Sequence, residues 1–224
     1  RYTEMMDYYG MWAHQIKTPI AAMRILVQSG MDREENEENQ KLFRQLQMEL
    51  FKTEQYVEMV LSYLKIGDIA KDMVLERCDL GKVVRQAVKK YSRLFILQKL
   101  SLEMGEIAEI VLTDEKWLSF VVEQILSNAL KYTKSGSVSI YLEQEGVLVI
   151  KDTGIGISAE DLPRIMEKGY TGYNGRIDKR STGIGLYLCK KVMDKLHHQL
   201  RIDSEDGKGT KVVLDLRRTQ LDLE

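Results

Sequence analysis

The sequence is poor in cysteine, has no long apolar run and carries almost no net charge, and each shortage argues against a class of protein. Its two cysteines, Cys78 and Cys189, form no CxxC pair, so we expect a reducing compartment and neither a disulfide framework nor a zinc site. No apolar run is long enough to cross a bilayer, and no signal peptide is visible. The formal net charge of -1 argues against a nucleic-acid-binding surface spread over the whole protein, although it is compatible with a local basic patch, and no nucleic-acid partner is expected.

The chain begins at Arg1, and residues 2–11 already have the pattern of the middle of a helix. We therefore expect a fragment of a longer protein. A connection to a membrane is expected only through a segment that is absent from this chain.

The distribution of the 16 glycines separates a helical part from a mixed part of the chain. Before residue 66 glycine is rare, and apolar residues recur every three or four positions, which is the period of an amphipathic helix. The two apolar stripes are Trp12, Ile16, Ile20, Met23 and Val27, then Phe43, Leu46, Leu50, Val57, Leu61 and Leu64. We expect a helical hairpin with its turn at Gly30 and residues 32–39. Such a hairpin either pairs with a second copy as a four-helix bundle or packs against the rest of its own chain.

The remainder of the chain has the pattern of an α+β sandwich. Strands are expected at 73–78, 100–104, 110–113, 138–143, 147–152, 200–204 and 210–216, and helices at 79–91, 114–132 and 183–196. Asp79 is the expected N-cap of the first of these helices. The predicted domains are 1–66 and 73–224, joined by a linker at 67–72. Residues 153–182 have little periodicity, and so long a loop in a compact domain is generally functional or disordered.

Two glycine clusters flank this loop, at 152–156 (DTGIG) and 181–186 (STGIGL). The second stands directly before a predicted helix. Glycines at a helix start let backbone N–H groups approach a phosphate, and the helix dipole favours its negative charge. Neither cluster is a Walker loop, and neither lies in a βαβ unit. Each cluster alone therefore fits a plain turn better than a phosphate site.

The predicted helix at 114–132 carries Asn128 and Lys131 three residues apart, and so on one face, followed by Tyr132. An amide oxygen and a cation are what Mg²⁺-triphosphate requires, because they supply a hard ligand and a counter-charge. Taken alone, these residues fit a solvated helix end better.

His14 lies opposite the apolar stripe of the first predicted helix, about 200° around the helix axis from its first member. We expect it to be exposed on the same face as Thr18, near a kink at Pro19. A neutral imidazole is a competent nucleophile, and its phosphoramidate is labile enough to pass the phosphoryl group on. An exposed histidine without a role is the simpler interpretation. The other histidines, His197 and His198, are expected on the surface at a helix end.

Five segments in this order resemble the sequence boxes of sensor histidine kinases of two-component systems. They are the phospho-acceptor box 14–19 (HQIKTP), the asparagine box 123–132 (EQILSNALKY), the first glycine box 152–156, the aromatic box 167–176 (EKGYTGYNGR) and the second glycine box 181–186. Each box alone is modest evidence, but five in order with suitable gaps are highly specific. The acceptor and aromatic boxes are most similar to those of small-sensor kinases of Gram-positive bacteria that respond to envelope stress and peptide antibiotics.

The resemblance implies a dimerisation and histidine-phosphotransfer hairpin, followed by a Bergerat-type ATP-binding domain. It implies ATP-dependent autophosphorylation of His14 with Mg²⁺, and phosphotransfer to an aspartate of a cognate response regulator. The partners would be a second copy, forming a dimeric four-helix bundle, and that regulator. The chain would be the cytoplasmic portion of a bacterial plasma-membrane protein.

The resemblance also implies roles for the box residues. Asp152 would accept a hydrogen bond from the adenine amino group, and Asn128 would bind Mg²⁺. Gly154 and Gly156 would let the lid begin close to the base, and Tyr132 would pack near the ribose or adenine. The other expected ATP-binding residues are Lys131, Arg176, Arg180, Thr182, Gly183, Gly185 and Leu186.

Three positions bear on the catalytic assignment. Gln15 stands where a carboxylate commonly acts as base in the family, so the base lies elsewhere or the step needs less base catalysis. Gln124 replaces an asparagine at the start of its box and is a second expected Mg²⁺ ligand. Thr18 matches the position that orients a water in phosphatase activity, which is a further expectation. The expected catalytic residues are thus His14, Gln15 and Thr18.

Two other functions fit parts of the sequence. Another ATPase of the same superfamily would share the asparagine and glycine boxes but would lack the acceptor box. A catalytically impaired dimeric scaffold is compatible with Gln15. Against the scaffold stands the joint presence of Asn128, Asp152 and the four box glycines, which a dead domain does not need.

Overall fold

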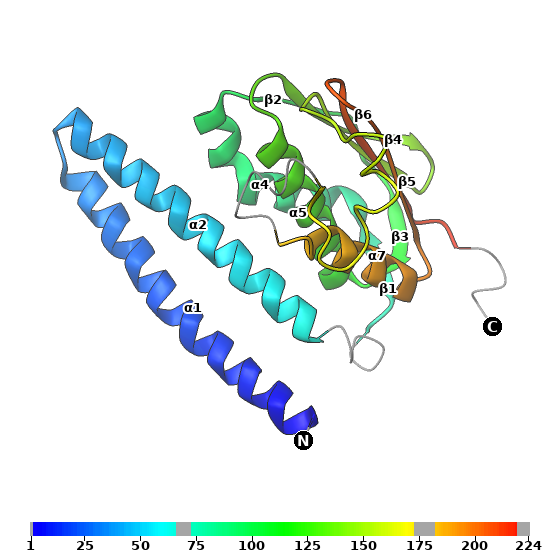
Figure 1. The fold of residues 1–224 in the computed structure, drawn as a ribbon, viewed down its shortest axis with the longest axis horizontal. Coiled ribbons are helices and arrows are strands. Elements are labelled where there is room, and N and C mark those ends of the chain that lie inside the picture. The colour runs from blue at the N-terminus through cyan, green and yellow to red at the C-terminus, as the bar shows by residue number, and fades with distance from the viewer. Residues whose placement is uncertain (1, 66–72, 173–181, 219–224) are drawn as a thin grey trace. The chain divides into compact units, whose positions relative to one another are not determined.

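The computed structural model describes residues 2–65, 73–172 and 182–218 (Figure 1), with side chains described from Gln15 onward in the first helix. The chain divides into two compact units, Arg1–Gly67 and Asp68–Glu224. The side chain of His14 and the whole of Arg176 and Arg180 lie outside the described residues, so the expectations for them stay predictions. None of the helices in the described ranges combines the length and the apolar character needed to cross a membrane.

The first unit is a hairpin of α1 (Tyr2–Arg33) and α2 (Glu37–Lys65). The predicted turn at Gly30 is wrong, because α1 continues through it to Arg33. A Cβ atom on Gly30 would lie 2.7 Å from two atoms of the Phe43 ring. Gly30 is therefore a point of close helix packing, which offsets the roughly 0.5–1 kcal/mol that glycine costs within a helix. The actual turn is short, and the side chain of Asn36 accepts from the first free amides of α2, at 2.8 Å from Glu38 N.

The hairpin leaves much of its apolar surface exposed. Ile20, Val57 and Met59 are buried. Among the hairpin side chains that the structure describes, six large apolar ones are at least 43% exposed, namely Met23, Ile25, Leu26, Leu42, Leu46 and Tyr56. Two of these, Met23 and Leu46, belong to the predicted apolar stripes. Because burial of such side chains is worth roughly 1.5–3 kcal/mol each, covering this surface with another apolar surface would be favourable.

The second unit contains a five-stranded sheet in the order β2–β4–β5–β7–β6 and a separate pair, β1–β3. The strands are β1 (Glu76–Asp79), β2 (Ser101–Met104), β3 (Ile110–Thr113), β4 (Ser137–Gln144), β5 (Val147–Asp152), β6 (Gln199–Glu205) and β7 (Gly209–Asp215). Both predicted hairpins, β4–β5 and β6–β7, are antiparallel as expected. The edge strand β2 is parallel to β4, so the sheet is mixed.

Three helices lie along one face of this sheet (Figure 1), which confirms the α+β sandwich. They are α4 (Leu80–Gln98), α5 (Glu115–Tyr132) and α7 (Gly185–Lys195). The core between the layers includes Leu118, Ile125, Leu148, Ile150 and Leu188, all at most 2% exposed. Asp79 caps α4 as predicted, accepting from Lys82 N at 2.9 Å. The helix runs beyond its predicted end because its apolar face continues through Phe95.

His198 corrects the expectation of a surface histidine. It is 3% exposed, and its Nε2 lies 3.0 Å from Thr113 Oγ1. His197 adopts a left-handed conformation with φ 57° and is exposed. This conformation ends the helical path after α7 and turns the next residue into the core, which a helical projection of the sequence cannot show.

Asp114 joins the start of the second unit to helix α5. Its Oδ1 accepts from Trp117 N at 3.0 Å and caps the helix. Its Oδ2 accepts from Val74 N at 2.9 Å. One buried carboxylate therefore satisfies two backbone amides from distant parts of the chain.

Asp114→Ala should lower the free energy of unfolding by about 1–3 kcal/mol, because both amides lose their acceptor. Asp114→Asn should cost less, since an amide oxygen can keep the helix cap while its NH₂ group cannot accept from Val74. Urea denaturation of the three proteins measures the series. An alanine variant as stable as the parent would contradict the role.

Candidate functional site

The end of α5, the end of β5 and the turn after it meet at the first predicted glycine box. The amide of Ile155 donates to the carbonyl of Tyr132 at 3.1 Å. Asp152 is the last residue of β5, directly before this turn. The structure therefore brings together Tyr132, Asp152 and Gly154, as the sequence predicts.

Asp152 is a buried and firmly oriented carboxylate. It is 6% exposed. Its Oδ1 accepts from Gly154 N at 2.8 Å and from Thr210 N at 3.3 Å. Burial raises the pKa of Asp152 above its ordinary value, and hydrogen bonds from the two amides and from the Thr133 side chain oppose this rise. The site thus holds a desolvated acceptor whose direction is set by backbone on two sides.

Glycine is required at the first box because the backbone there leaves no room for a side chain. A Cβ atom on Gly154 would lie 2.5 Å from the Tyr132 carbonyl oxygen and 2.8 Å from Asp152 Oδ1. Gly156 has φ +69°, and its Cβ would lie 2.0 Å from the Glu205 carbonyl oxygen. The box therefore forms a close-packed backbone surface beside the carboxylate.

The turn between β6 and β7 also belongs to the site. The sequence pattern predicts a hairpin there but no role in the site. Gly207 N donates to the Ile155 carbonyl at 2.7 Å. Gly209 has φ +101°, and a Cβ atom there would lie 2.1 Å from the Asp152 carbonyl oxygen. The next residue, Thr210, supplies one of the two amides on Asp152. The available signal is a Gly-x-Gly-Thr run, residues 207–210, at the start of the buried strand β7.

The second predicted glycine box leads into α7, which packs against α5. Gly183 has φ +64° and its carbonyl accepts from Gly169 N at 2.9 Å. Thr182 Oγ1 accepts from Ile184 N at 3.4 Å, a long contact. No side chain among the described residues caps the first turn of α7 from its N-cap, Ile184. Amides in the first turn of a helix have no intrahelical acceptor, so those at Gly185 and Leu186 could donate to an anion.

The predicted metal and phosphate residues of α5 lie on one helix face. Gln124 and Asn128 are half-buried and one turn apart, and Lys131 follows on the same side as an exposed cation. Lys131 Nζ lies 5.1 Å from the Tyr132 ring centroid. Two amide oxygens and one cation on adjacent turns fit a magnesium-bound phosphate.

The predicted catalytic residues of the hairpin lie on α1, in the other compact unit. Gln15 and Thr18 are exposed, and Pro19 lies within the helix, which continues on both sides of it. Lys17 Nζ is 4.0 Å from Glu58 Oε1 of α2.

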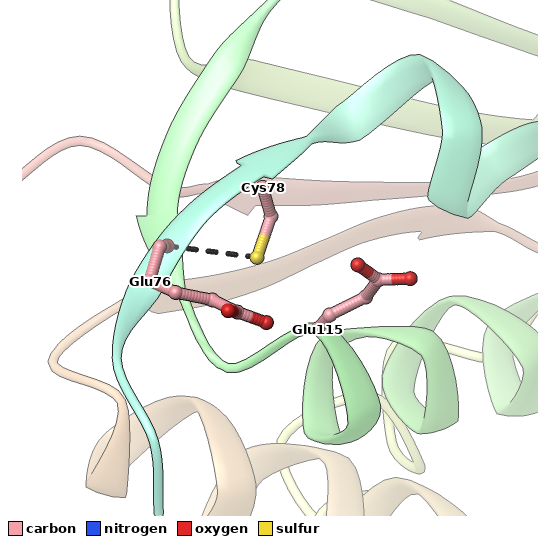
Figure 2. Close-up of side chains that lie close together, drawn as sticks. All are labelled: Glu76, Cys78 and Glu115. Carbon is pink, nitrogen blue, oxygen red and sulfur yellow. Dashed lines mark hydrogen bonds between the residues drawn. The ribbon is translucent and has the colours of Figure 1, made fainter.

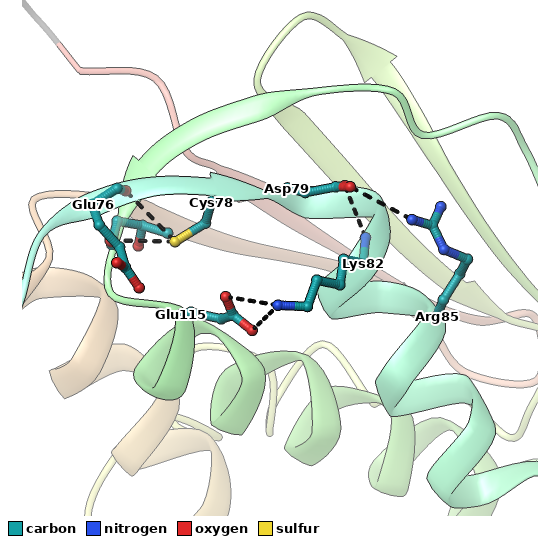
Figure 3. A network of polar contacts seen from close by, with 7 residues as sticks. Glu76, Cys78, Asp79, Lys82, Arg85 and Glu115 are labelled. Atoms are coloured by element: carbon teal, nitrogen blue, oxygen red, sulfur yellow. Dashed lines mark hydrogen bonds and ion pairs between the residues drawn. The ribbon is translucent and has the colours of Figure 1, made fainter.

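A second cluster of polar side chains could suggest a metal site (Figure 2). One ligand atom each from Glu76, Cys78 and Glu115 lie within 4.8 Å of one another. Lys82 already neutralises Glu115, at 3.0 and 3.4 Å from its two carboxylate oxygens (Figure 3). The Cys78 thiol donates to the carbonyls of Glu76 and Thr113, and burial raises the pKa of Cys78 above its ordinary value. The cluster is best explained as a structural joint between β1, α4 and α5.

Sequence comparisons relate the chain to kinases of two-component systems. Residues 113–220 match the family described as "Histidine kinase-, DNA gyrase B-, and HSP90-like ATPase". The chain is 34% identical over 213 residues to the sensor histidine kinase YxdK of Bacillus subtilis (strain 168), covering 92% of this chain and 63% of the relative. It is 35% identical over 207 residues to the sensor protein kinase GraS of Staphylococcus aureus (strain MRSA252), covering 91% and 58%. The chain thus spans about three fifths of the length of these relatives.

Solved structures share the fold. Full-length ShkA, crystallised in complex with AMPPNP, matches with a TM-score of 0.64 and 19% identity over 93% of this chain and 45% of ShkA. The Acinetobacter baumannii histidine kinase AdeS matches with a TM-score of 0.56 and 19% identity, over 92% of this chain and 98% of AdeS. At these identities the structural likeness shows the fold alone, whereas the sequence relatives confirm the predicted family. The chain belongs to the sensor histidine kinase family.

Proposed function

We propose that this chain uses ATP to phosphorylate His14 and passes the phosphoryl group to an aspartate of a response regulator. The observation that carries the ATP half of the proposal is Asp152, a buried carboxylate set against glycine backbone. The experiment that tests it is incubation with radiolabelled ATP and Mg²⁺, followed by acid and alkali treatment of the labelled protein. A phosphohistidine is labile in acid and stable in alkali.

Asp152 has the properties of an adenine acceptor. Both backbone amides on this side chain donate to Oδ1, and the Thr133 side chain also interacts with the carboxylate. Oδ2 receives neither amide and is the oxygen we assign to the ligand. The exocyclic amino group of adenine is a donor that matches it. Because the carboxylate is desolvated, leaving it without that donor would cost about 1–3 kcal/mol. Gly154 and Gly156 let the turn pack tightly beside Asp152, so that the loop after it begins close to the base.

The phosphates would lie toward the start of α7. Its first-turn amides and the helix dipole favour an anion. Asn128 and Gln124 would hold Mg²⁺, which neutralises phosphate charge when bound. Lys131 would add a counter-charge, while Arg176, Arg180, Thr182 and Leu186 complete the set of residues we assign to ATP.

The acceptor step is a displacement at the γ-phosphorus. A ring-nitrogen lone pair of neutral His14 forms the N–P bond while the bond to the bridging oxygen breaks and ADP leaves. The remaining ring proton is then lost to a base, and Gln15 cannot be that base because an amide does not take up a proton near neutral pH. Phosphoryl transfer proceeds through a loose transition state and depends mainly on positioning, so this step needs little base assistance. Thr18, one turn further along α1, is exposed as a phosphatase role would require.

The exposed apolar side chains of the hairpin support a homodimer. A second hairpin would cover Met23 and Leu46, which belong to the predicted stripes yet are 44% and 43% exposed. A four-helix bundle buries such stripes in its core. We propose that this dimer acts in the cytoplasm, next to the response regulator that it phosphorylates.

Replacing Met23 and Leu46 together by lysine should convert a dimer into a monomer, because the bundle core would have to bury unpaired charges. Sedimentation at micromolar concentration measures this. The matched control is Ile96→Lys on α4, where the side chain is 75% exposed, and this variant should sediment like the parent. A parent protein that is monomeric at that concentration would contradict the bundle.

A further inference from the structure

Tyr170 is held through both its hydroxyl group and its ring. The hydroxyl donates to Asp161 Oδ1 at 2.5 Å. The guanidinium carbon of Arg164 lies 4.3 Å from the centroid of the ring. Arg164 is itself fixed, since its Nε and Nη2 donate to Glu167 Oε2 at 3.2 and 3.1 Å. Tyr170, on the loop after β5, is therefore held at its hydroxyl group by Asp161 and over its ring by Arg164.

Asp161 is fixed from its own side as well. Its amide donates to the carbonyl and the hydroxyl of Ser158, at 3.1 and 3.2 Å. Its carbonyl accepts from Arg164 N at 2.9 Å. Gly172 packs so closely that a Cβ atom there would lie 3.1 Å from Asp161 Oδ2. The carboxylate that receives the tyrosine hydroxyl therefore belongs to a folded turn.

The backbone at Tyr170 lies against the second glycine box. Gly169 N donates to the Gly183 carbonyl at 2.9 Å. A Cβ atom on Gly183 would lie 2.6 Å from the Tyr170 carbonyl oxygen and 2.5 Å from the Gly169 carbonyl carbon. The carbonyl of Gly183 belongs to the peptide that leads directly into α7. A fixed position of Tyr170 therefore restricts the conformation of the Gly183 peptide, which sets the direction of the first amides of α7.

We propose that Tyr170, through its hydrogen bond to Asp161, is a positioning residue that holds the second glycine box in its phosphate-binding conformation. This inference rests on the proposed function and concerns only the phosphate side of the site. A phenylalanine could occupy the same volume and stack under Arg164, but it could not make this bond. A hydroxyl donating to a carboxylate is among the stronger hydrogen bonds in proteins, and Tyr170 is half-buried, which limits its exchange for water.

The test is equilibrium binding of ATP and of adenosine to the parent protein and to Tyr170→Phe. ATP affinity should fall roughly tenfold, which corresponds to about 1.4 kcal/mol, while adenosine affinity should not change. Asp161→Asn combined with Tyr170→Phe should bind ATP no more weakly than Tyr170→Phe alone, because both changes remove one bond. The matched control is Tyr141→Phe, a half-buried tyrosine of β4, which should bind both ligands like the parent.

The outcomes separate this inference from the proposed function. Unchanged ATP affinity in Tyr170→Phe would overturn the inference and leave the proposed function standing. An equal fall for ATP and adenosine would also overturn it, because a general loss of folding moves both ligands. A parent protein that binds neither ligand would overturn the proposed function and the inference together.

Discussion

His14→Ala should abolish the acid-labile, alkali-stable label that the parent protein acquires from radiolabelled ATP. A phosphoramidate on histidine has this stability, and the histidines of the chain are His14, His197 and His198. Of these, His198 is buried against Thr113 and cannot reach a nucleotide without unfolding. The expected loss is complete because the nucleophile itself is removed.

The control for this loss is His197→Ala. His197 is exposed, so it is the other histidine that could accept a phosphoryl group, and this variant should label like the parent. His14→Ala should still bind ATP, since the ATP residues lie in the other compact unit. Label that persists in His14→Ala would refute the acceptor assignment. A parent that binds ATP yet takes up no label would favour the impaired scaffold instead.

The strands and helices that sequence reasoning placed correctly are those whose signals are local. The strands at 110–113 and 147–152 are found at their predicted bounds, because short apolar runs ended by polar residues specify them. Asp79 was predictable as an N-cap for the same reason. The role of Gly30 was not predictable, because a glycine at such a position can either end a helix or allow a neighbouring helix to pack closely. Only the position of Phe43 on another helix decides between them.

The candidate site shows the same division. The glycine boxes and Asp152 could be predicted as a set because their residue types stand close together in the chain. The support that orients Asp152 could not, because Thr210 lies on β7, which pairs with β5 in the sheet but is far from it in the sequence. The two amides on Asp114 also come from separate segments. Such contacts depend on strand pairing, which a single sequence does not specify.

Asp152→Asn should weaken ATP binding by about 1–3 kcal/mol, or roughly 5- to 150-fold. An asparagine oxygen can still accept from the amides of Gly154 and Thr210, so the turn should keep its structure. The NH₂ group would then replace Oδ2 and face the amino group of adenine, donor against donor. Adenosine should lose affinity as much as ATP does, in contrast to Tyr170→Phe. The matched control is Asp203→Asn on β6, an exposed carboxylate that should leave both affinities unchanged.

Asp152→Asn should lower the affinity for nucleotide without lowering the free energy of unfolding. The reason is that burial, which raises the pKa of Asp152, penalises the charged form of this side chain. For the protein without nucleotide, lowering the pH through that raised pKa protonates the carboxyl group and removes the penalty, so this residue contributes more stability at acid pH. The same protonation turns an acceptor into a donor and should weaken nucleotide binding, at a pH above the ordinary range for aspartate. Asp152→Asn should therefore unfold at no lower urea concentration than the parent and should lose the parent's acid dependence of binding. Unchanged nucleotide affinity, or an acid dependence that survives the substitution, would show that Asp152 does not hold the base.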